Sequence, residues 1–297
     1  MNDLDFYSTQ STFSDPGKNS YLLSKLPDSI TELCNIVHGL VLQKDYTQKL
    51  YNFAAPKERK SEADLRFIEK ILDRITEIDN SPLSKKRSPQ NRLFGTCRDF
   101  ALLLVSFLRH KHIPARLRFG FATYFNPKWY EDHVVSEYWS ADQRKWILVD
   151  PELGEEEIRE CNIKFSNTNI PRNKFLTSSV AWKMIRDRKV SGDLFGVPVI
   201  KIKGTWFVFA SVVRDLTSLN KVELLPWDYT KFTDRNFKNL SDLNPEETGL
   251  IDKISELTLD VTKNLQKIIS MYRNDSRLNG NNTLVSYTIN GSITVSI

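Results

Sequence analysis

The stretch that most constrains the fold lies at residues 94–108 and reads FGTCRDFALLLVSFL. Its apolar residues recur at helical spacing and then widen until the helix is apolar on almost every side, which predicts a helix buried inside a domain. Thr96 has the position of an N-cap, and Asp99 follows it at the spacing of a capping box. The helix is therefore expected to begin at Cys97.

This placement gives the Cys97 thiol a possible chemical role. A thiol at a helix N-terminus lies near the positive end of the macrodipole and near free N–H groups, which lower its pKa from the usual ~8.5. Such a cysteine is prepared to act as a nucleophile. The alternative is that Cys97 is only a small buried hydrophobic residue, as most lone cysteines are.

The totals describe an ordinary globular protein with room for one large domain or a core with additions: 297 residues, 40% hydrophobic and 27% charged. The net charge of +5 is modest, and no basic stripe with spaced aromatic residues accompanies it, so a nucleic-acid partner is not expected. The three cysteines form no CxxC pair, which argues against a disulfide framework or a zinc site. No metal or cofactor is therefore expected.

Targeting signals are also absent from the pattern. The N-terminal residues lack a basic region followed by an apolar run, and no apolar stretch approaches membrane-spanning length. The expectation is a cytoplasmic protein with reduced thiols and no membrane partner.

Periodicity gives a coarse order of elements along the chain. The expected helices cover 28–44, 61–79, 94–108, 178–190, 212–220 and 245–273. After Pro114 the period changes from 3.6 to 2, and the expected strands cover 115–125, 132–139 and 144–150, with strand-like runs in 197–213 and a terminal hairpin from 283. The expected division is a loose arm over 1–20, a domain over 21–230 and a C-terminal helical and hairpin segment over 231–297.

The strands at 132–139 and 144–150 are expected to form an antiparallel hairpin. With the turn centred between Ala141 and Asp142, His133 stands opposite Asp150, with Cβ atoms ~5 Å apart. Asp150 would then fix the tautomer of His133, and Nε2 would be free to take the proton of Cys97. A register shifted by one residue would undo this arrangement. The alternatives are that His133 is only structural and that Asp150 simply ends a strand.

These residue types suit attack of a thiolate on a carbonyl carbon, with the histidine protonating the leaving amine. The backbone N–H of Cys97 would hold the oxyanion, and Gln90 or Asn91 could supply a second donor or be plain loop residues. The arginines on or near the core elements could bind a carboxylate or phosphate of the substrate or be solvated; they are Arg98, Arg116 and Arg118.

Three motifs together resemble the transglutaminase-like superfamily. They are the helix start Gly95-Thr-Cys97-Arg-Asp-Phe-Ala101, the strand that begins Asp132-His133, and Trp146-Ile-Leu-Val-Asp150-Pro151. The resemblance implies an α+β, papain-like core over about 90–155, in which a buried helix with a cysteine at its N-terminus packs on an antiparallel sheet. It also implies a triad in which Cys97 is the nucleophile, His133 the base and Asp150 the orienting acid.

The sequence also departs from some members of that superfamily. Arg98 stands where animal transglutaminases carry Trp, no EF-hand-like calcium loop is visible, and the zinc-binding cysteine pairs of some peptide N-glycanases are missing. The expected function is that of an amide hydrolase or acyltransferase, cysteine-protease-like or transglutaminase-like. It would act through an acyl-thioester on a peptide, a protein or a small amide or thioester. The alternative is a catalytically silent binding or scaffold module of the same fold.

Overall fold

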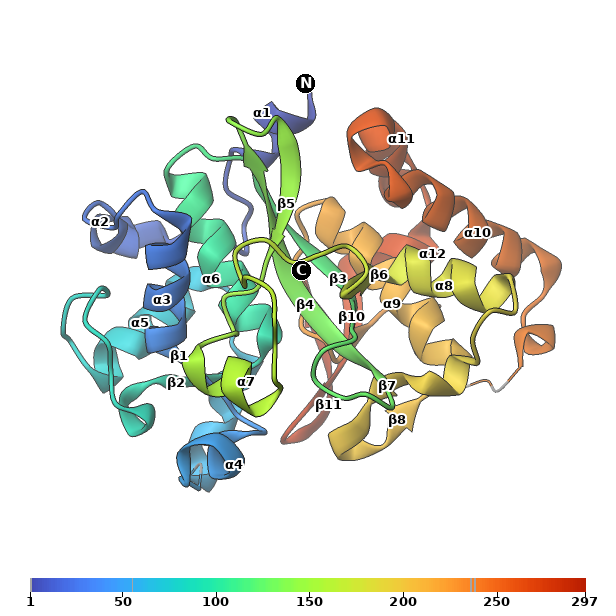
Figure 1. The fold of residues 1–297 in the computed structure, drawn as a ribbon. Coiled ribbons are helices and arrows are strands. Elements are labelled where there is room, and N and C mark those ends of the chain that lie inside the picture. The colour runs from blue at the N-terminus through green and yellow to red at the C-terminus, as the bar shows by residue number, and fades with distance from the viewer. Residues whose placement is uncertain (1, 55, 236, 238) are drawn as a thin grey trace. The chain divides into compact units, whose positions relative to one another are not determined.

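The computed structural model describes residues 2–54, 56–235, 237 and 239–297, and helices and strands are mixed along the chain, as the expected α+β class requires (Figure 1). The chain forms two compact units. Unit 1 comprises Asp3–Leu117 and Val135–Pro171, and unit 2 comprises Arg118–Val134 and Arg172–Ile297. Strands β3 (Ala115–Ala122) and β4 (Tyr130–Ser140) contribute residues to both. The boundaries of these units in the sequence do not fall near residues 20 and 230, where they were expected.

Unit 1 is mainly helical. Its helices are α1 (Asp3–Tyr7), α2 (Ser20–Leu23), α3 (Ile30–Leu40), α4 (Thr47–Tyr51), α5 (Ile68–Ile78), α6 (Cys97–His110) and α7 (Glu155–Glu160). Its short strands are β1 (Val41–Gln43), β2 (Leu93–Gly95) and β5 (Lys145–Val149). β1 and β2 pair in parallel, and β5 pairs antiparallel with β4.

Helix α6 forms the core of unit 1, as its sequence predicts. Every residue from Cys97 to Arg109 is buried. At its start, the Thr96 N–H donates to Asp99 Oδ2 at 2.9 Å, the capping contact expected from the spacing. In its second turn, the Ala101 carbonyl accepts a hydrogen bond from Ser136 Oγ of β4 at 2.9 Å. These contacts hold the N-terminal half of α6 in a defined position against β4.

The N-terminal segment is packed rather than loose, contrary to the expected arm. Tyr7 is fully buried. Gln10 Nε2 donates to the Ser106 carbonyl at 2.9 Å, and Arg109 Nη1 donates to Ser14 Oγ at 2.9 Å. The polar side chains that suggested a solvated arm instead satisfy polar groups of α6.

Unit 2 combines strands from two sheets with a second set of helices. Its strands are β6 (Phe175–Thr177), β7 (Phe195–Val197), β8 (Ile202–Lys203), β9 (Asp228–Tyr229), β10 (Thr283–Thr288) and β11 (Gly291–Ser296). Its helices are α8 (Ser178–Arg186), α9 (Thr205–Leu219), α10 (Pro245–Leu259), α11 (Val261–Asn274) and α12 (Ser276–Asn279). The strand orders are β6-β3-β4-β7-β8 and β11-β10-β9, so the expected terminal hairpin is confirmed.

Two expectations in unit 2 are wrong. The run Trp206-Phe-Val-Phe lies in helix α9, not in a strand, and all of α9 except Trp206 is buried. A short run that is apolar on all sides does not distinguish a buried strand from a buried helix. The single helix expected over 245–273 is two helices, because Asp260 leaves the helical conformation and its side chain caps α11 by accepting from the Lys263 N–H at 3.1 Å.

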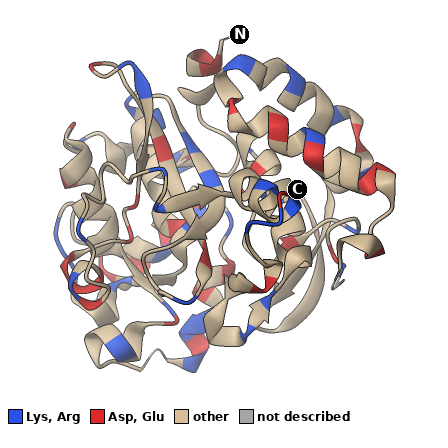
Figure 2. Cartoon of the chain, turned by 45° about the vertical axis from the view of Figure 1, so that its right-hand side comes forward, with Lys and Arg blue, Asp and Glu red and all other residues tan. Residues whose placement is uncertain are grey.

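Charged residues of both signs lie on helices and loops along the chain (Figure 2). This mixture agrees with the modest net charge. Within the described ranges, no helix combines the length and the apolar character needed to cross a membrane.

Candidate active site

Cys97 is the first residue of α6 and is 7% exposed. The chain enters the helix through Gly95, which ends strand β2. A Cβ at Gly95 would lie 2.8 Å from Val41 Cγ1 and 3.0 Å from Asp99 Oδ2, so only glycine fits without displacing a neighbour. The position of the thiol at the helix start is therefore determined by close packing of the residues just before it.

The hairpin register differs from the predicted one by two residues. Ser136 pairs with Val149 and Ser140 with Lys145, whereas the predicted register would pair Ser136 with Ile147. The loop between the strands covers 141–144, one residue later than expected, and Arg144 closes it in the left-handed conformation, with φ of 50°. The expectation that His133 stands directly opposite Asp150 is therefore wrong. If the observed pairing of β4 with β5 is continued beyond the end of β5, the residue that pairs with His133 is Glu152.

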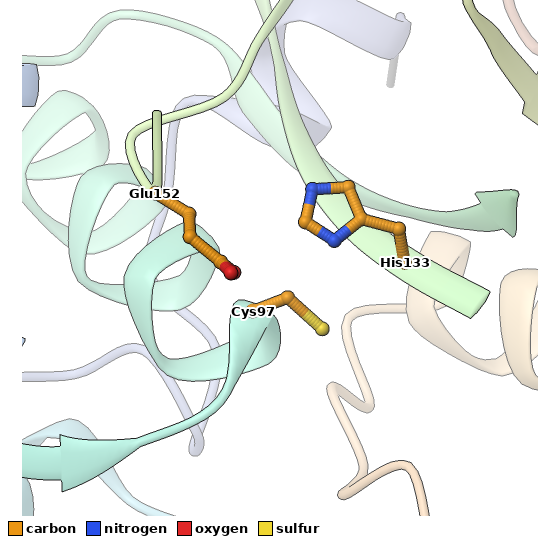
Figure 3. A group of neighbouring side chains, drawn as sticks. All are labelled: Cys97, His133 and Glu152. Atoms are coloured by element: carbon orange, nitrogen blue, oxygen red, sulfur yellow. The ribbon is translucent and has the colours of Figure 1, made fainter. Parts of the chain in front are cut away.

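Glu152 is a neighbour of Cys97 that was not expected from the sequence. Its carboxylate and the Cys97 Sγ offer atoms within 4.8 Å of each other, and Glu152 is 4% exposed. In Figure 3 its side chain leaves the loop after β5 and extends toward Cys97 at the start of α6. The correct hairpin register would have singled it out, because an acid two residues beyond Asp150 then becomes as good a candidate as Asp150.

Asp150 directly follows the last residue of β5 and is 1% exposed. Its Oδ1 accepts the Glu152 N–H at 3.0 Å, and its own N–H donates to the Asn167 carbonyl at 2.8 Å. Burial, and to a smaller extent the charge of Asp150, raise the pKa of the Cys34 thiol. Cys34 lies on α3 and is buried in the core, and the raised pKa favours its thiol form.

The loop that carries Asp150 and Glu152 is held by α7. Glu157 Oε2 accepts the Gly154 N–H at 3.0 Å and lies 3.0 Å from His38 Nε2, while Oε1 accepts from the Tyr51 hydroxyl at 3.1 Å. Burial would raise the pKa of Glu157, but the hydrogen bond and charge of His38 outweigh it and the pKa is lowered. His38, Glu156 and Glu157 also offer metal-ligating atoms within 4.8 Å of one another, but these contacts already engage both oxygens of Glu157.

His133 lies on the part of β4 that belongs to unit 2 and is 2% exposed. Three aromatic rings surround its imidazole at steep angles, with centroid distances of 4.9 Å to Phe125, 5.9 Å to Tyr124 and 6.4 Å to Phe175. Such edge-to-face packing restricts the orientation of the ring. Figure 3 shows the imidazole projecting from β4.

Two acidic residues, Asp132 and Glu137, lie near His133 on β4. Glu137 is fully buried and its Oε2 lies 2.7 Å from Arg116 Nη2. Burial raises the pKa of the Asp132 carboxyl, while the nearby charge of Arg214 opposes that change.

The arginines singled out in the sequence are buried and paired with carboxylates, so the solvated alternative is wrong, and a substrate-binding role for Arg98 stays a prediction. The Arg98 side chain is fully buried and pairs with Asp99 Oδ1 at 3.0 Å. Arg118 pairs with Asp215 in unit 2 at 2.8 Å. Arg116, as described above, pairs with Glu137. An arginine in each of these places satisfies a carboxylate that would otherwise be buried alone.

Gln90 and Asn91 lie on a single 3-10 turn, Pro89–Asn91, and both are exposed. The Gln90 backbone carbonyl accepts from Arg59 Nη1 at 2.7 Å, which fixes this turn. This contact leaves the role of the two side chains untested, so a second oxyanion donor at these positions stays a prediction.

Comparison with known proteins gives one family match. No curated protein sequence matches the chain. A solved structure named as that of a "Putative Cysteine Protease" from Cytophaga hutchinsonii aligns with 18% identity and a TM-score of 0.33, over 59% of this chain and 45% of that one. Residues 47–151 match the family described as the transglutaminase-like superfamily. This matched range contains Cys97, His133 and Asp150. Over residues 47–151 this chain is therefore similar to the transglutaminase-like superfamily.

Proposed function

We propose that this chain is a cysteine enzyme that attacks an amide-type carbonyl and forms an acyl-thioester on Cys97. The observation that carries the proposal is the place of Cys97, at the first residue of a buried helix inside the range that matches the transglutaminase-like superfamily. A helix N-terminus stabilises the thiolate and offers backbone N–H groups to an oxyanion. A cysteine with a merely structural role does not require this position.

In the proposed reaction His133 and Asp150 complete the set of catalytic groups. The Cys97 thiol transfers its proton to His133 Nε2 and attacks the carbonyl carbon, and the tetrahedral oxyanion is held by the Cys97 backbone N–H. The carbon–nitrogen bond then breaks, and His133 returns the proton to the leaving amine. Asp150, which the motif resemblance assigns to this role and which lies in the matched range, keeps the imidazole in the required tautomer.

The thioester is then resolved either by water, which gives hydrolysis, or by an amine, which gives transfer. In both cases the nucleophile loses a proton to His133, the carbon–sulfur bond breaks, and the thiolate is regenerated. Hydrolysis requires access of water to the thioester, and transfer requires an amine site that excludes it. Hydroxylamine added to a reaction with a peptide substrate would release a hydroxamate if the thioester forms.

The first test is the pH dependence of Cys97 alkylation by iodoacetamide, read by peptide mass spectrometry in the presence of a chelator. We expect Cys97 to react well below pH ~8.5 and to lose this reactivity in His133→Ala. Cys34, whose pKa is raised by burial, serves as an unreactive internal control, and Cys161, which is partly exposed, as a reference thiol.

The outcome that contradicts the proposal is a Cys97 that reacts no faster than Cys161 at any pH, with no effect of His133→Ala. The silent binding module would then be the better description. Asp150→Asn tests the role of the third proposed catalytic residue. We expect it to shift the pH dependence of Cys97 alkylation although the thiol itself is unchanged.

A further inference from the structure

We infer that strand β11 forms an antiparallel pair with β11 of a second copy of this chain, and that a two-fold axis at Thr294 relates the two copies. The inference does not depend on the proposed function, because it concerns the C-terminal hairpin of unit 2. It assigns an interaction surface, the outer edge of β11, and a partner, an identical strand.

The first support is the open edge of the three-stranded sheet. β11 is the outer strand in the order β11-β10-β9 (Figure 1), and among the described residues it pairs with β10 alone. It is six residues long, from Gly291 to Ser296. An edge strand presents a row of backbone N–H and C=O groups that can pair with a strand of another chain.

The second support is that the edge strands β6, β8 and β9 of unit 2 are short, whereas β11 is long and uncharged. β9 and β8 each contain two residues, and β8 ends in Lys203. β6 contains three residues and directly follows Lys174. By contrast, no residue from 278 to 297 is charged, and β11 contains no proline. Short length, lysine and proline are common means of preventing edge pairing, so β11 lacks the features that would block a partner strand.

The hydrogen bonds of the hairpin determine which residues of β11 face outward. The Tyr287 N–H donates to the Trp227 carbonyl at 3.1 Å, away from β11, so Tyr287 and its partner Ser292 form a non-hydrogen-bonded pair. Such pairs alternate with hydrogen-bonded pairs along an antiparallel ladder. The backbone N–H and C=O groups of Ser292, Thr294 and Ser296 are therefore directed away from β10. They make no backbone hydrogen bond to any other part of the chain that the structure describes.

These outward groups determine the register of the proposed pair. Outward-facing residues of the two copies must lie opposite one another, and a two-fold axis at Thr294, the central one, gives the longest overlap. Thr294 then lies opposite itself, and Ser292 lies opposite Ser296 of the partner subunit. Ile293, which is 46% exposed, lies opposite Val295 of the partner subunit, a pairing of β-branched side chains that stabilises sheets.

The composition of β11 favours an identical strand as its partner. Two-fold pairing places each residue opposite a residue of the same strand, so any charged side chain near the axis would meet a like charge. β11 carries no charge, and its Ile, Thr and Val residues favour extended structure. A charged peptide or a membrane surface would find no opposite charge on this edge. The two-fold pair occupies both open β11 edges, so the assembly closes at two copies.

The test is sedimentation velocity of the full chain between about 1 μM and 1 mM, the range in which weak complexes form. Thr294→Pro removes only an outward N–H, so pairing with β10 should remain while pairing between copies is lost. Thr294→Val keeps this N–H and is the matched control. We expect a monomer–dimer equilibrium for the wild type and for Thr294→Val, and a dissociation constant raised at least about tenfold in Thr294→Pro, because the two-fold axis doubles the loss.

Amide hydrogen exchange tests the register. Within one copy the amides of Ile293 and Val295 face β10, whereas those of Ser292, Thr294 and Ser296 face outward and are bonded only in the pair. We expect exchange of the outward amides to slow as the protein concentration rises. Exchange at the two inward positions should change much less.

Three outcomes overturn the inference. They are a wild-type chain that stays monomeric up to about 1 mM, a dimer that Thr294→Pro leaves unchanged, and outward amides whose exchange does not depend on concentration. If Thr294→Pro does not fold, as judged by near-UV circular dichroism, Thr294→Lys replaces it. The lysines of the two copies would then meet at the axis, which should raise the dissociation constant about fivefold, and an unchanged constant contradicts the pairing.

Discussion

At the scale of single residues, three carboxylates close together in the sequence have sharply different surroundings. Glu152 has a carboxylate oxygen within 4.8 Å of the Cys97 sulfur, whereas Asp150, two residues earlier, accepts the Glu152 backbone N–H. Glu157, a few residues later, serves structure by holding the loop for both. All three side chains are carboxylates, so the role of each one depends on which groups it contacts.

The pH dependence of the free energy of unfolding should reveal the contribution of Glu157 to stability. Its folded-state pKa is lowered, so its contribution is present above the unfolded value of ~4.3 and is lost as pH falls through the folded pKa. We expect Glu157→Gln to lower the free energy of unfolding by about 1–3 kcal/mol at pH 7. Urea titrations from pH 7 to pH 3 should show this difference shrinking below about pH 4, and a constant difference would contradict the assignment.

The buried pair of Arg118 and Asp215 gives a second residue-scale prediction. Arg118 Nη2 lies 2.8 Å from Asp215 Oδ2, and Oδ1 also accepts the Phe119 N–H at 2.9 Å. Asp215→Asn should lower the free energy of unfolding by about 3–5 kcal/mol, because it leaves a buried guanidinium without its counter-charge. In a denaturant study, Arg118→Met combined with Asp215→Asn should lose less than the sum of the single changes, and strict additivity would argue against a coupled pair.

At the scale of elements, close packing around Gly95 determines where helix α6 begins. Gly95 is enclosed by β1 and by Asp99, so the strand β2 ends and the helix follows within two residues. The chemistry proposed for Cys97 depends on this junction, because only the first helical residue has its thiol beside unsatisfied N–H groups.

Gly95→Ala tests the junction. The added Cβ requires a shift of Val41 or Asp99, so we expect a loss of about 1–3 kcal/mol in unfolding free energy and slower Cys97 alkylation. Gly249→Ala is the control: Gly249 lies inside α10, and a Cβ there meets nothing within 4 Å, so this change should stabilise by about 0.5–1 kcal/mol. Equal effects of the two substitutions on Cys97 would show that the junction does not matter.

At the scale of the whole molecule, the two units share strands rather than a single linker. The chain passes from unit 1 to unit 2 within β3 and back within β4. A strand that unfolds in one unit therefore loses support in the other.

We accordingly expect one cooperative unfolding transition. In urea, exposure of the buried Cys34 thiol in unit 1, followed by a thiol reagent, should have the same midpoint as loss of amide protection in α9 of unit 2. Separate midpoints would show that the units unfold independently.

The features that could be predicted from the sequence are those that depend on local pattern. The buried helix with Cys97 at its start follows from periodicity and capping, and the β4–β5 hairpin and the β10–β11 hairpin follow from alternation. The helix α9 could not be predicted, because a fully apolar run carries no period. Nor could the place of Glu152, because the loop before Lys145, not the strands, sets the register.

The loop between β4 and β5 determines which residues of the two strands lie opposite each other. Alternation along a strand distinguishes a slip of one residue, which inverts every side chain, but does not distinguish a slip of two. Between Ser140 and Lys145 the loop alone makes that second choice. If the turn formed one residue earlier, each side chain would stay on the same face of its strand. Each residue of β4 would then lie opposite a different residue of β5 and of the segment after it, so a different acid would pair with a given position on β4. Evolution could thus exchange the acid of this hairpin by changing the loop, without altering either strand.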